Sequence, residues 1–80
     1  MTVKILGTGC KKCQNLEQKV RGLAALNNIE ADFIKVTEIS DIVKYGIMMT
    51  PGLVINENVK SAGIIPKDEL IITWLKEGTF

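Results

Sequence analysis

Histidine is absent from this chain of 80 residues. Its absence removes the commonest zinc ligand and the commonest general base near neutral pH. Only two cysteines are present, Cys10 and Cys13, which are too few for the disulfide framework of a small secreted domain. These two side chains therefore carry the only obvious chemistry near neutral pH.

The chain also has no excess of charge and few aromatic residues. Ten Lys and Arg residues are balanced by nine Asp and Glu, for a formal net charge of +1, and the aromatic fraction is 5%. A nucleic-acid-binding domain usually carries a pronounced basic face. We therefore expect no nucleic-acid partner.

Long apolar runs are missing as well. The N-terminal run Thr2–Leu6 contains Lys4 and stops at Gly7, so it is far shorter than a membrane span or the apolar part of a signal peptide. In a reducing cytosol, a close pair of cysteines is more often catalytic or metal-binding than structural. We expect a soluble, cytoplasmic protein without a membrane partner.

The length leaves room for one thin hydrophobic core, so we expect a single domain over residues 1–80, acting as a monomer. Apolar periodicity and the positions of Gly, Asn and Pro predict the elements. The predicted strands are 2–6, 31–36, 52–55 and 59–62, and the predicted helices are 10–28, 38–45 and 66–78. The helical side chains expected to face the core are Leu16, Val20, Leu23, Ala24, Ile39, Ile42, Val43, Leu70, Ile71, Trp74 and Leu75.

The order of these elements predicts an α/β fold. The first two strands are joined through a helix, which favours a parallel pair with a right-handed crossover. The last two strands are separated by the short turn 56–58, which is typical of an antiparallel hairpin. The sequence therefore predicts the order βαβαββα, with a four-stranded mixed sheet flanked by helices.

Cys10 and Cys13 fall where the first loop enters a helix. Helical spacing brings their Cα atoms to about 5 to 6 Å, a separation that a disulfide accepts. At the helix N-terminus the free N–H groups, and the nearby Lys11 and Lys12, stabilise a Cys10 thiolate. Position alone therefore makes Cys10 the nucleophile, Cys13 the resolving thiol, and the two lysines redox-tuning residues.

Two other interpretations of the cysteine pair stay open. Gly7–Cys13 resembles the loop of copper(I) carriers, which place Met where Thr8 stands here and use a ferredoxin-like βαββαβ order. A copper(I) or other thiophilic-metal carrier is therefore the alternative to redox chemistry. A non-catalytic interaction module is the third class.

Beyond the CxxC motif, Thr50-Pro51 precedes the predicted hairpin and Gly63 follows it. With Cys10-Lys11-Lys12-Cys13 opening a helix after a strand, the chain resembles the thioredoxin-like superfamily. It is most similar to the small redox-active disulfide proteins, which have a minimal thioredoxin-like or glutaredoxin-like fold.

This resemblance implies a thiol–disulfide oxidoreductase that needs no bound cofactor or metal. It implies a cis Pro51 that faces the disulfide, with Thr50 and Gly63 completing the substrate-binding set. Its substrate would be a protein or small-molecule disulfide, and a separate reductase would supply electrons.

Met48 and Met49 lie just before the third strand, and we expect at least one of them to fill the core.

Overall fold

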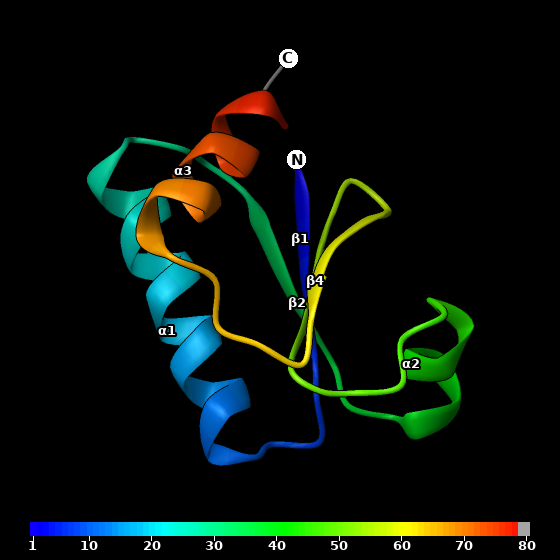
Figure 1. The fold of residues 1–80 in the computed structure, drawn as a ribbon. Helices are drawn as coiled ribbons and strands as arrows, with labels where there is room; N and C mark the ends of the chain where they lie inside the picture. Colours follow the sequence, from blue (N-terminus) through cyan, green and yellow to red (C-terminus); the bar gives the residue numbers. More distant parts are fainter. Residues whose placement is uncertain (79–80) are drawn as a thin grey trace.

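The computed structural model describes residues 1–78 and has the predicted element order (Figure 1). Each boundary lies within two residues of its prediction. The last helix begins at Asp68 rather than at Pro66, because Lys67 is still extended (φ −66°, ψ 151°). The elements are β1 (Thr2–Leu6), α1 (Lys11–Leu26), β2 (Asp32–Val36), α2 (Ile39–Lys44), β3 (Gly52–Ile55), β4 (Asn58–Ala62) and α3 (Asp68–Glu77).

The four strands form one mixed sheet in the order β2-β1-β3-β4. β1 and β2 are parallel, while β1 pairs antiparallel with β3 and β3 with β4. Asn56 and Glu57 both have positive φ, 49° and 68°, as a tight two-residue hairpin turn requires. The predicted α/β fold with a mixed four-stranded sheet is confirmed.

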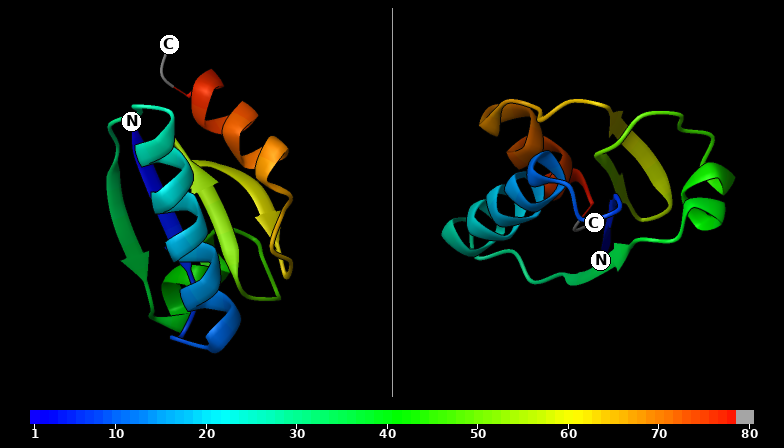
Figure 2. Two further views of the ribbon diagram at one scale, coloured as in Figure 1. Left: turned by 90° about the vertical axis from the view of Figure 1, so that its left-hand side faces the viewer. Right: turned by 90° about the horizontal axis from the view of Figure 1, so that it is seen from below.

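The main core lies between the sheet and the pair α1 and α3, which run along one face (Figure 2). Alternate residues of β1 and β3 point into it because side chains alternate across a strand. Leu16, Val20 and Ala24 meet them from α1 at helical spacing, as predicted. Its buried members are Val3, Ile5, Leu16, Val20, Ala24, Leu53, Ile55, Ile71 and Leu75.

Within residues 1–78, α2 is the one helix on the opposite face of the sheet, and it lies at one end (Figures 1 and 2). A second, smaller cluster forms there from Leu6, Ile42, Ile47 and Val54. Because α2 has six residues, it turns one buried side chain, Ile42, toward the sheet.

Three predicted core positions on the helices are wrong. Ile39, Val43 and Leu70 are 67%, 59% and 48% exposed. Trp74 is half-buried and packs against the main core. Helical spacing correctly identified an apolar face in each case, but that face is wider than the surface that covers it.

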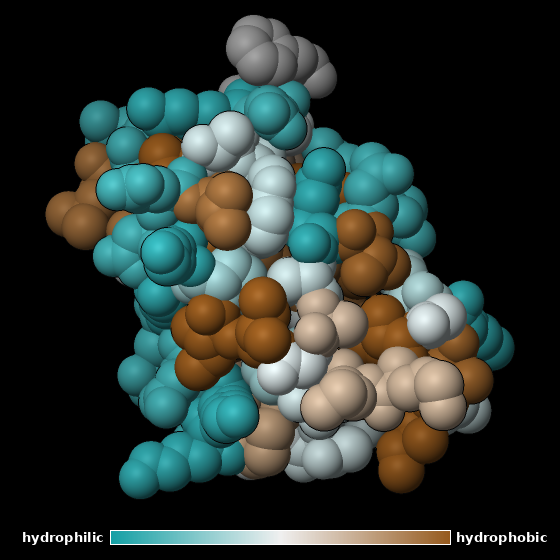
Figure 3. All heavy atoms as spheres, viewed as in Figure 1, coloured by the Kyte–Doolittle hydropathy of each residue, from teal (hydrophilic) through white to brown (hydrophobic). Residues whose placement is uncertain are grey.

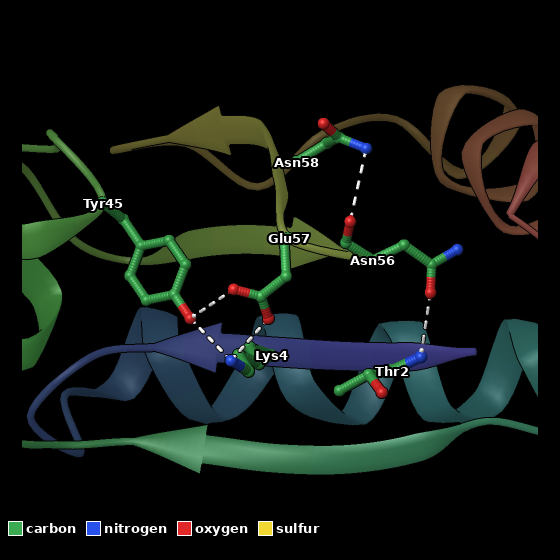
Figure 4. A network of polar contacts seen from close by, with 6 residues as sticks. All are labelled: Thr2, Lys4, Tyr45, Asn56, Glu57 and Asn58. Carbon is green, nitrogen blue, oxygen red and sulfur yellow. Dashed lines mark hydrogen bonds and ion pairs between the residues drawn. The ribbon is translucent and has the colours of Figure 1, made fainter.

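Lys4 lies on the face that α2 leaves open, with a side chain 21% exposed. Its ammonium donates to the Tyr45 hydroxyl and to Glu57 Oε1, both at 2.6 Å (Figure 4). The bond to Glu57, followed by that to Tyr45, raises the pKa of Lys4, and the same bond lowers the pKa of Glu57. This network ties the end of α2 to the β3–β4 turn across β1.

Within residues 1–78, no helix is both long and apolar enough to cross a bilayer.

The core assignment predicts unequal costs for two leucines of α1. Leu16 is fully buried and Leu26 is 80% exposed. Leu16→Ala should lower the free energy of unfolding by about 2 to 5 kcal/mol, through lost burial and the cavity left behind. Leu26→Ala should change it by less than about 0.5 kcal/mol. Urea unfolding of the oxidised protein measures both, and equal losses would contradict this packing.

Candidate functional site

Cys10 and Cys13 form a disulfide at the start of α1, with their Cα atoms 5.1 Å apart. This separation lies within the range predicted from their spacing. The two cysteines differ in exposure, because Cys10 is exposed while Cys13 is only 5% exposed. A partner in solution therefore reaches the Cys10 side of the pair.

Cys10 is the N-cap residue of α1, with φ −64° and ψ 163°. Its Sγ accepts the Cys13 backbone N–H at 3.2 Å. A cap acceptor at this position satisfies one of the free N–H groups of the first turn. A thiolate is a stronger acceptor than a disulfide sulfur and also meets the positive end of the helix macrodipole, so this geometry favours ionised Cys10 in the reduced protein.

Gly7 allows Cys13 to pack onto the end of β1. A methyl group at Gly7 would overlap Cys13 Sγ and come within 2.9 Å of Cys13 Cβ. The sequence indicated Gly7 only as a strand breaker, and this packing role was missed. The run Gly7-Thr8-Gly9 directly before a cysteine is the local signal, but the overlap itself depends on how α1 sits against the sheet.

The Thr50–Pro51 peptide bond is cis, as the resemblance implies. A Cβ added to Gly7 would overlap Cys13 Sγ and would lie 4.0 Å from Thr50 Cβ. Thr50 therefore lies beside the disulfide. Pro51 is buried, and its carbonyl accepts the Gly63 N–H at 2.8 Å. The fold thus brings Thr50, Pro51 and Gly63 to the end of the sheet where α1 begins.

Lys11 and Lys12 are the first two residues of α1, and both are exposed. The first turn of α1 contains no acidic residue. In the part of the chain that the structure describes, neither ammonium pairs with a carboxylate. Cations at a helix N-terminus are unfavourable unless an anion is near, and the adjacent anion available after reduction is the Cys10 thiolate.

Met48 and Met49 are not core filler, so that prediction is wrong. They are 98% and 66% exposed, and Ile64 on the neighbouring loop is 58% exposed. Figure 3 shows hydrophobic side chains gathered over α2 and over the loops that enter β3 and leave β4. Met48 also lines a groove that reaches Thr8 and Thr50, between α2 and the loop before Cys10. An apolar surface therefore adjoins the disulfide.

Acidic and cysteine side chains do not gather into a metal-binding cluster in residues 1–78. No group of three or more His, Cys, Asp or Glu residues of that range is placed to hold an ion.

Comparison with known proteins gives consistent matches over nearly the whole chain. A sequence model of the family described as thioredoxin domain matches residues 1–76. The chain is 35% identical over 71 residues to a protein named thioredoxin from Methanothermobacter thermautotrophicus, an alignment that covers 89% of this chain and 92% of that protein. It is 32% identical over 76 residues to a protein named thioredoxin from Methanocaldococcus jannaschii, covering 95% of this chain and 87% of that protein.

The contact between Cys13 and Gly7 predicts opposite effects for two Gly→Ala changes. Gly7→Ala should lower stability by about 1 to 3 kcal/mol, because the added methyl overpacks a filled position, and should expose the Cys13 thiol to alkylation. Gly22→Ala is the control, because Gly22 lies within α1 and an added Cβ meets nothing within 4 Å. It should raise stability by about 0.5 to 1 kcal/mol. Urea unfolding and mass-spectrometric mapping of alkylation measure these effects, and an unchanged Gly7→Ala protein would rule out the packing role.

Proposed function

This chain belongs to the thioredoxin domain family, and we propose that within it Cys10 attacks the substrate and Cys13 resolves the product. The family membership makes the protein a thiol–disulfide oxidoreductase. The copper-carrier alternative is not favoured, and the βαβαββα order differs from the βαββαβ order of those carriers. The single observation that carries the assignment of roles is the exposure of Cys10 beside the burial of Cys13.

The proposed reaction is two successive thiol–disulfide exchanges. The Cys10 thiolate attacks one sulfur of the substrate disulfide, which releases one substrate thiolate and leaves a mixed disulfide on Cys10. Cys13 then attacks Cys10 Sγ, which releases the second substrate thiolate and forms the Cys10–Cys13 disulfide. The two electrons pass to the substrate sulfurs, and an external reductase restores the dithiol.

For the substrate, we propose an extended peptide segment next to a disulfide in a protein. Thr50, Pro51 and Gly63 lie at the end of the sheet where α1 begins. Because the Pro51 carbonyl and the Gly63 N–H bond each other, the peptide would pair with the backbone groups of Thr50. The exposed apolar side chains of Met48 and Ile64 support a peptide over a small polar disulfide, because a peptide has apolar area to bury against them. We propose that the peptide docks at this end of the sheet. We also propose that the protein works in the cytoplasm.

We assign the tuning of the potential to Lys11 and Lys12. In the disulfide form their charges lie at the positive end of α1, whose first turn contains no acidic residue. In the reduced form the Cys10 thiolate supplies that anion. The lysines therefore stabilise the reduced form more than the oxidised form, which makes the couple more oxidising.

The role assignment predicts which thiol reacts first. In the reduced protein at mildly acidic pH, iodoacetamide should modify Cys10 before Cys13, because a thiolate at the N-cap is both ionised and exposed. Cys10→Ser should abolish this rapid reaction. Cys13→Ser should retain it and should trap mixed disulfides with substrates. Peptide mapping identifies the modified residue, and earlier modification of Cys13 would reverse the two roles.

The tuning assignment predicts a shift in potential. Each exposed charge near a helix N-terminus contributes about 0.3 to 1 kcal/mol, and about 1.4 kcal/mol corresponds to 30 mV for a two-electron couple. The Lys11→Gln/Lys12→Gln double variant should therefore be more reducing by roughly 10 to 40 mV. A glutathione redox titration at low ionic strength measures the shift, and added salt should shrink it. A control with Lys60→Gln, on β4, should not move the potential, whereas a more oxidising double variant would refute the electrostatic account.

A further inference from the structure

Met48 and Met49 are two adjacent thioethers on the outside of the molecule. Met48 is 98% exposed and Met49 is 66% exposed, and neither belongs to the core clusters formed within residues 1–78. The third methionine, Met1, is partly buried and packs against the main core. Packing of the fold therefore explains Met1 but does not explain Met48 and Met49.

The two exposed methionines lie on either side of the Thr50–Pro51 bond. Met48 lines a groove of about 410 Å³ between α2 and the loop that follows β1. Met49 lies over Gly63, because a Cβ added to Gly63 would come within 3.0 Å of Met49 Cβ and 3.5 Å of its sulfur. Figure 3 shows that the hydrophobic surface continues over the loops beside β3 and β4. Both thioethers therefore belong to the surface on which we propose that a peptide docks.

A thioether differs from an aliphatic side chain in its reaction with peroxides. It is flexible and polarisable, so it adapts its packing to different partners. A hydroperoxide can transfer one oxygen atom to the thioether sulfur, which loses two electrons, while the O–O bond breaks and water or an alcohol leaves. The product is a sulfoxide, which is polar and accepts hydrogen bonds. Because the oxidant has to reach the sulfur, exposed methionines react before buried ones.

We propose that Met48 and Met49 form an oxidation site, at which hydrogen peroxide or another hydroperoxide produces methionine sulfoxide and thereby blocks the docking of protein substrates. The proposal rests on the proposed docking of a peptide at this end of the sheet. An apolar side chain that packs against a sulfoxide removes water from its oxygen without offering a hydrogen-bond donor, which costs free energy. Oxidation therefore weakens docking while the two cysteines stay chemically unchanged.

The cysteine pair determines when this site reacts. In the reduced protein the exposed Cys10 thiolate is the better nucleophile, so peroxide first converts it to a sulfenic acid and leaves as water. The Cys13 thiol then attacks the sulfenic sulfur, which releases a second water and closes the disulfide. The disulfide contains no thiolate, so further peroxide reacts with the exposed thioethers. Methionine oxidation thus follows the loss of the dithiol.

The first measurement identifies the oxidised residues. The protein in its disulfide form is treated with hydrogen peroxide, and mass-spectrometric peptide mapping follows the sulfoxide at each methionine. Met48 and Met49 should be oxidised at least about threefold faster than Met1, because their sulfur atoms are more accessible. Oxidation of Met1 at the same rate or faster overturns the proposal.

The second measurement compares a protein disulfide with a small one. The treated protein is freed of peroxide, reduced with dithiothreitol, and mixed with insulin or with dithiobis-nitrobenzoate, an aromatic disulfide whose released thiolate absorbs visible light. The second-order rate constant for insulin should fall by about fivefold or more, because apolar contacts at the docking surface are lost. The rate constant for dithiobis-nitrobenzoate should stay within about twofold, because a small molecule has little apolar area to bury there. An equal fall for both substrates, or no fall for insulin, overturns the proposal.

The Met48→Leu/Met49→Leu double variant is the matched control. It keeps apolar side chains of similar volume and has no thioether at these positions. Whatever its rate with insulin before treatment, that rate should not change after peroxide. A loss of rate in this variant as large as in the unsubstituted protein overturns the proposal, because it traces the loss to other residues.

Reversal distinguishes the sulfoxide from general damage. Methionine sulfoxide reductases, one for each sulfoxide epimer, with dithiothreitol as electron donor, should convert both residues back to methionine and restore the rate with insulin. A rate that stays low after peptide mapping shows both sulfoxides removed overturns the proposal.

The Met48→Gln/Met49→Gln double variant separates failure of the docking surface from failure of the oxidation site. Glutamine is polar without any oxidation, so this variant should reduce insulin about fivefold more slowly than the unsubstituted protein. An unchanged rate rejects the docking surface and the proposal with it. A slower variant, together with an unsubstituted protein whose rate peroxide does not alter, rejects the oxidation site alone.

Discussion

The close approach of Cys13 to Gly7 is the contact on which the site depends. It sets the start of α1 directly on the end of β1, with no side chain between the helix and the strand. Because Cys13 is fixed against the sheet, the cap residue one turn earlier projects outward into solvent. The difference between an exposed sulfur and a buried one is therefore built by packing, and the unequal chemistry of two identical residues follows from it.

The register of the sheet brings the remaining site residues to the same place. Leu6 at the end of β1 pairs with Gly52 at the start of β3, and Gly52 pairs with Ala62 at the end of β4. The segments just beyond these positions are the loop to Cys10, the pair 50–51 and Gly63. Three stretches that are far apart in sequence therefore meet at the same end of the sheet, because in antiparallel pairs the end of one strand lies beside the start of the next.

Local patterns in the sequence were enough to predict the element order and the distance between the Cα atoms of the two cysteines. Both are short-range properties, set by side-chain alternation in strands and by helical repeat. The positions of Ile39, Val43 and Met48 were not predictable in this way, because a periodic apolar face does not tell whether anything covers it. The ion pair between Glu17 on α1 and Lys35 on β2 was not predictable either, because only the fold brings the two elements together.

Lys4 also bears on how the uncovered half of the sheet behaves toward other molecules. It pairs in register with Ile34 on one side and with Val54 on the other, and Val54 pairs with Val59. One row of side chains therefore crosses the open face, and Ile34 and Val59 in it are 45% and 43% exposed. A second sheet stacking on this row would have to take the Lys4 ammonium out of water, which is costly for a charged group. Lys4, held by Tyr45 and Glu57, therefore opposes stacking of another sheet on this face.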